Sequence, residues 1–230
     1  MSTTTVARRG SHAVDQSERA WWLRTLLVLQ SPRAVFSALR DDSTEAEEAR
    51  QEPVLLLVLL AGIAGVLAGP TTGTLLDDFG IDVVSAVVIV FLSGVVYAVF
   101  GYWIVGGALY LGSRWLGSLG SYRRSRHLLG FASAPLALSL VAVAPVRFAA
   151  YGSDVFRSGG SDAGAGGDVF TGIAVGFGAW ALVLLVIGVR TVHGWSWGRA
   201  LAACAASAAV LGVVLAVWAA LGGRFGHVSG

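Results

Sequence analysis

Lysine is absent from this chain, and charge of either sign is scarce. Only 13% of the 230 residues are charged, whereas a soluble domain carries about 25%. All 16 basic residues are therefore arginines. With 55% hydrophobic residues and a mean hydropathy of +0.72, the composition excludes an ordinary soluble globular domain and indicates a membrane protein.

Cysteine and the common catalytic groupings are scarce as well. The single cysteine, Cys204, lies inside an apolar run, which excludes a disulfide framework or a CxxC motif; we interpret it as a small buried apolar residue. The four histidines lack metal-ligand spacing, and no P-loop or Ser/His/Asp grouping is present. We therefore expect no catalytic residue, no cofactor, no metal site and no nucleic-acid partner, and a protein that is not an enzyme.

Five long apolar runs separated by short polar stretches are what the sequence does contain. Most of them approach the roughly 20 residues that a helix needs to cross a hydrocarbon core. Because the runs are continuous rather than alternating, helices are the spanning elements that fit. The sequence predicts an all-α polytopic membrane protein with five transmembrane helices, at 54–69, 81–103, 128–146, 169–189 and 201–221.

Three of these spans have features of their own. The first run is short, and its apolar pattern extends past Pro70. The second continues towards Trp115, so its helix should tilt or project beyond the bilayer, and Asp82 is expected to cap it. Pro135 should kink the third helix, and the length of that helix places Arg147 at the membrane rim.

The arginines lie on alternate polar stretches. Thirteen of them fall on the side of the N-terminus and three on the other side. The positive-inside rule then predicts a cell-membrane protein with a cytoplasmic N-terminus and an extracytoplasmic C-terminus. The N-terminal stretch has no cleavable apolar core, so we expect no signal peptide.

The chain divides into four parts. Residues 1–14 are small and polar, and are predicted to be disordered. Residues 15–52 are predicted to form a cytoplasmic amphipathic segment followed by an acidic linker. The five-helix transmembrane domain is expected at 53–221 and an extracytoplasmic tail at 222–230.

The amphipathic segment is expected to form two short helices. The second begins with Ser31 as its N-cap and Pro32 in the first helical position. We expect both helices to lie in the cytoplasmic interface, with their tryptophans in the headgroup layer. The alternative is a pair of soluble helices that pack on the cytoplasmic loops. The acidic stretch 41–52 is expected to be a solvated linker.

Arginines near this interface are the predicted contacts with anionic lipid headgroups. These are Arg19, Arg24, Arg33, Arg40, Arg123 and Arg124. Two stretches share the pattern Ser–aromatic–x–Arg, at 121–124 and 196–199, in which serine would cap a helix. The repeat fits either a duplicated hairpin or two independent helix starts.

Small residues recur at four-residue spacing in three spans. Such rows let helices approach closely. They indicate packing within the chain, or alternatively a homo-oligomer seam. The rows are Ala61, Gly65 and Gly69; Gly172 and Gly176; and Ala208, Gly212, Ala216 and Ala220.

The order of these features resembles the Yip family, the Rab/Ypt-interacting-protein-like membrane proteins. Residues 31–36 (Ser-Pro-Arg-Ala-Val-Phe) are similar to the proline–x–x–x–phenylalanine opening of prokaryotic members. Residues 130–135 resemble the glycine–aromatic–x–x–x–proline start of the family's third span, and 196–200 its fifth-span opening. The resemblance implies five spans with a cytoplasmic N-terminus. Eukaryotic members act as adaptors in ER–Golgi vesicle traffic, but this chain lacks their Asp-Leu-Tyr-Gly-Pro motif.

Two functions fit this sequence. The leading hypothesis is a non-enzymatic membrane scaffold or adaptor that engages lipid or protein partners through its cytoplasmic face. The alternative is a small transporter or channel for a neutral or lipidic solute, with a pathway near Pro135. A polar cavity that reaches mid-membrane beside this proline would favour transport, and a dry bundle would favour the scaffold.

Overall fold

The computed structural model describes residues 20–41, 43–77 and 80–226, without the side chains of 221–226. Within these residues the regular elements are all helical. Five helices are long and apolar enough to cross a membrane: Thr44–Leu67, Val83–Trp115, Tyr122–Phe156, Ala165–His193 and Trp197–Ala220. The predicted all-α, five-span architecture is therefore confirmed. The segment 1–14, Arg19 and residues 227–230 of the predicted tail lie outside the described residues.

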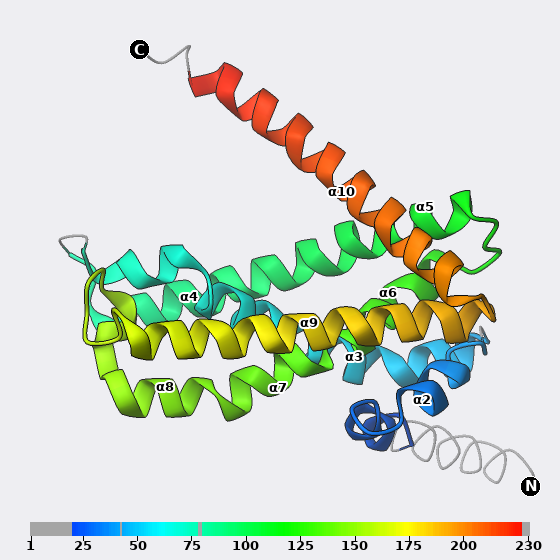
Figure 1. The fold of residues 1–230 in the computed structure, drawn as a ribbon, viewed down its shortest axis with the longest axis horizontal. Coiled ribbons are helices and arrows are strands. Elements are labelled where there is room, and N and C mark those ends of the chain that lie inside the picture. The colour runs from blue at the N-terminus through cyan, green and yellow to red at the C-terminus, as the bar shows by residue number, and fades with distance from the viewer. Residues whose placement is uncertain (1–19, 42, 78–79, 227–230) are drawn as a thin grey trace, which may run out of the picture.

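Several spans are assembled from shorter helices (Figure 1). The first and the last two are single helices: α3 (Thr44–Leu67), α9 (Ala165–His193) and α10 (Trp197–Gly226). The second joins α4 (Val83–Phe100), a π-helical turn η2 (Gly101–Val105) and α5 (Gly106–Trp115). The third joins α6 (Tyr122–Ala132), α7 (Ala134–Ala142), α8 (Ala144–Tyr151) and the 3-10 helix η3 (Gly152–Phe156). A helix at 20–27, α2 (Pro32–Ala38) and the 3-10 helix η1 (Pro70–Asp77) complete the fold.

The first span begins earlier in the chain than expected. Helix α3 starts at Thr44, where the Ser43 hydroxyl accepts the Ala46 N–H at 3.3 Å. Acidic residues in its first turn suit the positive end of the helix dipole. The predicted solvated linker is therefore wrong for 44–52, because these residues are the first turns of α3. At its other end α3 stops at Leu67, and the chain continues as the 3-10 helix η1 rather than as α-helix.

Prolines divide the third span. Pro135 lies in the first turn of α7, and Pro145 in the first turn of α8. Proline has no backbone N–H to donate, and its ring clashes with the preceding turn inside a helix. It fits the first turn of a helix, where no such turn precedes it. The helix is therefore interrupted next to Pro135, where a kink was predicted, and Pro145 follows a second interruption.

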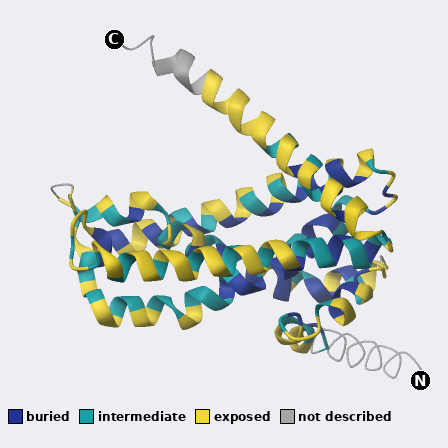
Figure 2. Cartoon of the chain, viewed as in Figure 1, coloured by how far each residue is buried: buried dark blue, intermediate teal, exposed yellow. Residues whose placement is uncertain are grey.

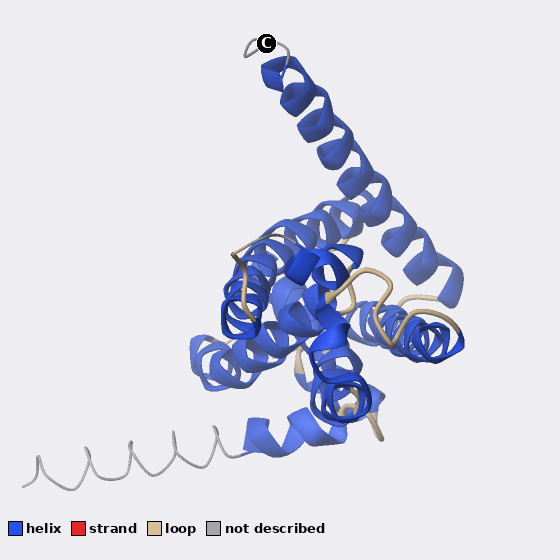
Figure 3. Cartoon of the chain, turned by 90° about the vertical axis from the view of Figure 1, so that its left-hand side faces the viewer, coloured by secondary structure: helices blue, strands red, loops and turns tan. Residues whose placement is uncertain are grey.

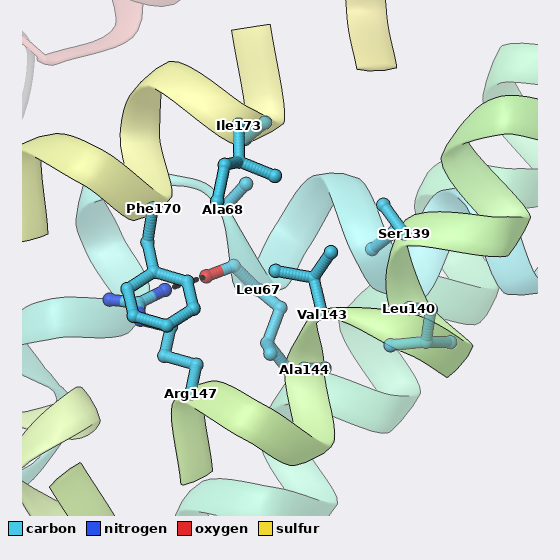
Figure 4. A pocket seen from close by; sticks show the side chains of 11 residues that line it. Leu67, Ala68, Ser139, Leu140, Val143, Ala144, Arg147, Phe170 and Ile173 are labelled. Atoms are coloured by element: carbon cyan, nitrogen blue, oxygen red, sulfur yellow. Dashed lines mark hydrogen bonds between the residues drawn. The ribbon is translucent and has the colours of Figure 1, made fainter. Parts of the chain in front are cut away.

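Arg147 joins the far end of this span to its neighbours. It donates to the Leu67 carbonyl at the end of α3 at 3.3 Å (Figure 4). It also donates to Asp162 at 2.9 Å. Phe170 of α9 lies beside it in a small pocket. Arg147 therefore links the third span to the end of α3 and to the loop before α9. Its predicted place at the membrane rim stays a prediction.

The second span is as long as predicted, and the predicted cap at its start is confirmed. The Asp82 carboxylate accepts the Ser85 N–H at 2.7 Å. This hydrogen bond holds the pKa of Asp82 below its usual value. The π-helical turn η2 interrupts the span, and such turns often occur at functional sites.

Helices α3 and α4 cross closely at two glycines. A Cβ added to Gly62 would lie 2.5 Å from the Gly94 carbonyl oxygen and 2.8 Å from the Ala98 Cβ. Most glycines of the expected small-residue rows do not lie at such a close helix crossing. A Cβ at Gly65, Gly172, Gly176 or Gly212 would meet no atom of the described chain within 4 Å. The prediction of close intramolecular packing is therefore wrong at these glycines.

Helix α10 leaves the bundle (Figures 1 and 3). Its first turns pack tightly, with Ala200 and Ala203 fully buried. Towards its other end the helix is exposed (Figure 2), and Trp218 there is 78% exposed. The helix also runs to Gly226, past the predicted boundary at 221. Burial of large side chains is concentrated where α2, the start of α6 and the end of α9 meet. We call this region, residues 20–50, 114–127 and 190–203, the arginine-rich end.

Candidate functional site

The largest fully buried side chain of the described residues is Arg50. Its Nε donates to Nδ1 of His127 at 2.7 Å, and its Nη1 donates to the Asp41 carbonyl at 2.8 Å. Arginine can only donate, so Nδ1 of His127 must accept and its ring proton lies on Nε2. That nitrogen is 2.9 Å from Gln51 Oε1, the amide oxygen that accepts the proton. Both partners of the Arg50–His127 contact are 0% exposed.

Glu47 supplies the carboxylate of this group. It lies 2.7 Å from Arg123 and 3.9 Å from Arg50. Positions 47, 50 and 51 share one face of α3, and positions 123 and 127 share one face of α6. We call these five side chains the Arg50 cluster. Because each buried charge has a polar partner, the cluster locks α3 against α6.

Arg126 has aromatic partners instead of a carboxylate. Its guanidinium carbon lies 3.9 Å from the ring centroid of Trp103, 4.8 Å from that of Tyr122 and 5.0 Å from that of Tyr102. The Tyr122 hydroxyl donates to the Trp103 carbonyl at 2.8 Å. The π-helical turn η2 contains both Tyr102 and Trp103. Cation–π attraction is strongest when the cation is desolvated, so this cage holds η2 against α6.

The N-terminal segment packs on this region through one face. Trp21 is 3% exposed, and the centroid of its ring lies 5.7 Å from that of Phe131. The guanidinium carbon of Arg24 lies 4.5 Å from the Trp21 ring centroid. Phe36 is fully buried against Gly188 of α9. The expected headgroup position is therefore wrong for Trp21, which is part of the protein core. The opposite face is uncovered, as Leu26 is 71% exposed.

Three of the arginines predicted to bind lipid also have acceptors within the protein. Arg40 donates to the Thr191 carbonyl near the end of α9, with its Nε at 3.0 Å. Arg124 donates to the Arg40 carbonyl at 2.9 Å, and Arg123 pairs with Glu47. Arg33 is exposed. Cations at carbonyl-rich helix ends are favoured by the helix dipole, so these arginines also fasten the helix ends.

The predicted serine caps differ in outcome. The Ser121 hydroxyl accepts the Arg124 N–H at 3.0 Å, and the Ser196 hydroxyl accepts the Arg199 N–H at 3.4 Å. Both Ser–aromatic–x–Arg stretches therefore start helices as expected. Ser31 accepts no cap hydrogen bond through its side chain, although Pro32 does begin α2.

A second polar feature lies between α3 and α4. Two grooves, of about 340 and 210 Å³, share Gly65 and Tyr97 as lining residues. The described polar lining consists of hydroxyls and carries no charge: Thr71, Thr72, Ser93, Tyr97, Tyr102 and Ser133. The Tyr102 hydroxyl is buried. We call these two grooves together the hydroxyl groove. Ser133 lies between α6 and α7, next to Pro135, so the hydroxyl groove reaches the position at which a solute pathway was expected.

A family model described as the Yip1 domain matches residues 26–219. The chain belongs to the Yip1 domain family. Searches of the curated proteins and of the solved structures each give no match. Two of the motifs that carried the resemblance begin a helix of this Yip1 domain, since Pro32 begins α2 and 196–200 open α10. The third, 130–135, runs from the end of α6 into the first turn of α7, within the third span.

Sequence reasoning missed the Arg50 cluster of this Yip1 domain. Glu47, Arg50 and Gln51 belong to the stretch that was expected to be a linker. The available signal was their helical spacing, matched by a similar spacing of Arg123 and His127. No group of three or more His, Cys, Asp or Glu side chains is placed to hold a metal ion in the part of the chain that the structure describes.

Proposed function

We propose that this Yip1-domain protein is a non-enzymatic membrane scaffold or adaptor whose arginine-rich end is its partner-binding face. The observation that carries the proposal is the way this end is fastened. The Arg50 cluster, the Arg126 cage and the arginine–carbonyl bonds connect α2, α3, α6 and α9. A rigid platform of this kind lowers the entropy cost of binding a partner.

The orientation is part of the proposal. The strong excess of arginines on the side of the arginine-rich end supports a cytoplasmic location for that end and an extracytoplasmic C-terminus. A reporter that is active only in the cytoplasm, fused after Gly230, is expected to be inactive. An active fusion would contradict the orientation.

Partner capture from native membranes tests the scaffold role. A photo-crosslinking residue placed at Arg33, which is exposed at the arginine-rich end, is expected to give a discrete protein adduct. Arg157 is exposed near the other end of the third span, so the same probe there is the matched control. Equal adducts at both positions, or none at Arg33, would count against the scaffold.

The hydroxyl groove favours a second candidate function, transport of a small neutral solute. Its uncharged lining suits a solute that carries no charge. The test is flux of glycerol into liposomes that contain the purified protein. Flux that Tyr102→Phe reduces and that changes around Pro135 abolish would support transport and overturn the scaffold proposal.

A further inference from the structure

Arg50 and Arg126 are the two buried arginines of the described residues, and their surroundings differ. Arg50 donates hydrogen bonds to His127 and to the Asp41 carbonyl. The guanidinium of Arg126 forms neither a hydrogen bond nor an ion pair with any described residue, although Arg126 is only 6% exposed and its Nε is enclosed. A guanidinium carries five N–H donors and no acceptor, so its burial without an acceptor oxygen is costly.

Aromatic rings surround Arg126 without supplying such an oxygen. The ring centroids of Tyr102, Trp103 and Tyr122 lie 3.9–5.0 Å from its guanidinium carbon. Ring faces attract the positive charge, but they replace the oxygen acceptors of a charged N–H only weakly. The Arg126 cage therefore stabilises a cation and leaves its donors available to a ligand.

The guanidinium is held in place, and its outer edge is open. A Cβ added to Gly106 would lie 2.6 Å from the Cγ of Arg126, so the stem of this arginine packs tightly against α5. The two Nη atoms are not enclosed as Nε is, and the outer edge of the guanidinium therefore reaches the surface. A fixed fork of N–H donors matches the oxygens of a phosphate group, and little side-chain freedom is lost when it binds.

The length of the second span indicates the depth of the cage in a membrane. Trp103 is 50% exposed and its ring is the nearest to Arg126. It follows Val83, the first residue of α4, by about 20 residues, which is about 30 Å of helix and the thickness of a hydrocarbon core. Tryptophan favours the membrane–water interface. With Val83 at one boundary of the hydrocarbon, the Arg126 cage lies at the other, at the level of lipid phosphates.

We propose that the Arg126 cage binds a phosphate group of an anionic phospholipid, and that the outer edge of the guanidinium donates to the phosphate oxygens. A soluble phosphate ester offers the same oxygens, but the depth of the cage favours a phosphate that the bilayer itself holds there. Arg126 is not among the arginines that the sequence predicted to contact headgroups. The site requires only the membrane location of the protein and does not depend on the scaffold role.

Lipid retention by the purified full-length chain tests the proposal. Phosphatidylglycerol and diacylglycerol with identical acyl chains are added in equal amounts to the protein in uncharged detergent, and native mass spectrometry counts the bound lipids. The two lipids differ in the phosphate-bearing headgroup. Phosphatidylglycerol is expected to be retained about tenfold more, a ratio that corresponds to ~1.4 kcal/mol and to one hydrogen bond with a charged group.

Three variants assign this preference to the guanidinium. Arg126→Gln should lower the retention of phosphatidylglycerol to that of diacylglycerol. Arg33→Gln, at an exposed arginine of the same end, should leave it unchanged. Tyr122→Phe removes the hydroxyl that donates to the Trp103 carbonyl but keeps the ring and the charge. It should also leave retention unchanged, which separates loss of the cation from loosening of the cage.

A measurement on the unchanged chain locates the lipid even where Arg126→Gln does not fold. Phosphatidylglycerol with a photoreactive group in its headgroup is expected to label residues 99–107 or 122–126. Labelling confined to other elements would overturn the proposal. Equal retention of both lipids by the unchanged chain, or full retention by folded Arg126→Gln, would do the same.

Glycerol 3-phosphate separates the two sources of phosphate. It is expected to displace phosphatidylglycerol only weakly, because it has no acyl chains to hold it at this depth. Binding as tight as that of the lipid would assign the cage to a soluble phosphate ester and overturn the lipid site. A protein that co-purifies with the unchanged chain and is lost with Arg126→Gln would identify a carboxylate partner instead. Partner capture at Arg33 is measured separately, so either proposal can fail without the other.

Discussion

The arginine-rich end and the crossing of α3 with α4 hold the same bundle together by different means. At the arginine-rich end, buried charges meet buried partners, as in the 2.7 Å contact between Arg50 and His127. At the crossing, Gly62 and Gly94 let two backbones approach. The two regions use different contacts because their surroundings differ. A charge costs more as it moves towards the bilayer centre, so deep contacts rely on packing of small residues.

The second half of α10 contrasts with both regions, because it leaves the bundle. In the spanning window of α10, 17% of the residues are buried inside the protein, the same share as in α9 and about half of the 33% in α3. What distinguishes α10 is the exposure of its last turns, where Trp218 is 78% exposed. Two regions of one membrane protein therefore differ in how strongly a substitution should act. Substitutions matched in chemistry but placed in different regions measure that contrast directly.

Arg50→Ala is expected to have the largest effect. It removes the donor to His127 and to the Asp41 carbonyl and leaves buried polar groups without partners. Breaking a buried charged network in this way costs about 3–5 kcal/mol. Unfolding in mixed micelles measures the loss. Arg33→Ala, at an exposed arginine, should stay within about 0.5 kcal/mol of the unchanged protein; equal losses in the two variants would show that the Arg50 cluster does not stabilise the fold.

The spans could be predicted from sequence because membrane thickness and hydropathy determine them directly. The cap at Asp82 and the break at Pro135 could also be predicted, since each depends on a few adjacent residues. The Arg50 cluster could not. It requires Glu47 to meet Arg123 and Arg50 to meet His127 across two helices, and the acidic composition near Glu47 resembles that of a solvated linker.

Contacts over long sequence distances also explain the errors about packing. A small-residue row shows that a helix can approach another closely, but not which helix comes near it. Gly62 was outside the predicted rows and lies close against α4, whereas Gly65, within a row, faces open space. Tryptophan is a residue type that often lies in the headgroup layer, yet Phe131 and Arg24 lie against Trp21. Only the three-dimensional arrangement distinguishes these cases.

Gly62→Ala is expected to have the next largest effect. The new methyl group would lie 2.8 Å from the Ala98 Cβ, so α3 and α4 must move apart. Overpacking of this kind costs about 1–3 kcal/mol. Gly65→Ala, one turn further along the same helix, provides the control because its methyl group meets no described atom within 4 Å. The same micelle assay compares the two. Both substitutions raise helix propensity, which by itself stabilises a helix, so a control that is destabilised equally would show that the crossing is not the cause of the loss.

Ser121→Ala tests a smaller, local contribution at the arginine-rich end. The hydroxyl accepts the Arg124 N–H at the start of α6, and loss of such a cap costs about 1 kcal/mol. Ser31→Ala is the matched control, since Ser31 makes no side-chain cap bond to α2. Hydrogen exchange of the first turn of each helix reports the effect locally. Faster exchange is expected at α6 and not at α2, and the reverse result would contradict the assigned caps.

Ala216→Leu should have the smallest effect and tests the isolation of α10. The position is exposed in the outer half of the helix, so the larger side chain displaces only lipid, and the change should stay below about 0.5 kcal/mol. If a second copy of the chain packs on the predicted row of Ala208, Gly212, Ala216 and Ala220, the added methyl groups would obstruct that close contact. The loss would then depend on the ratio of protein to detergent. Unfolding at two such ratios separates these outcomes: a small, ratio-independent change leaves α10 a lipid-facing helix, whereas a large, ratio-dependent one makes this row an interface between copies.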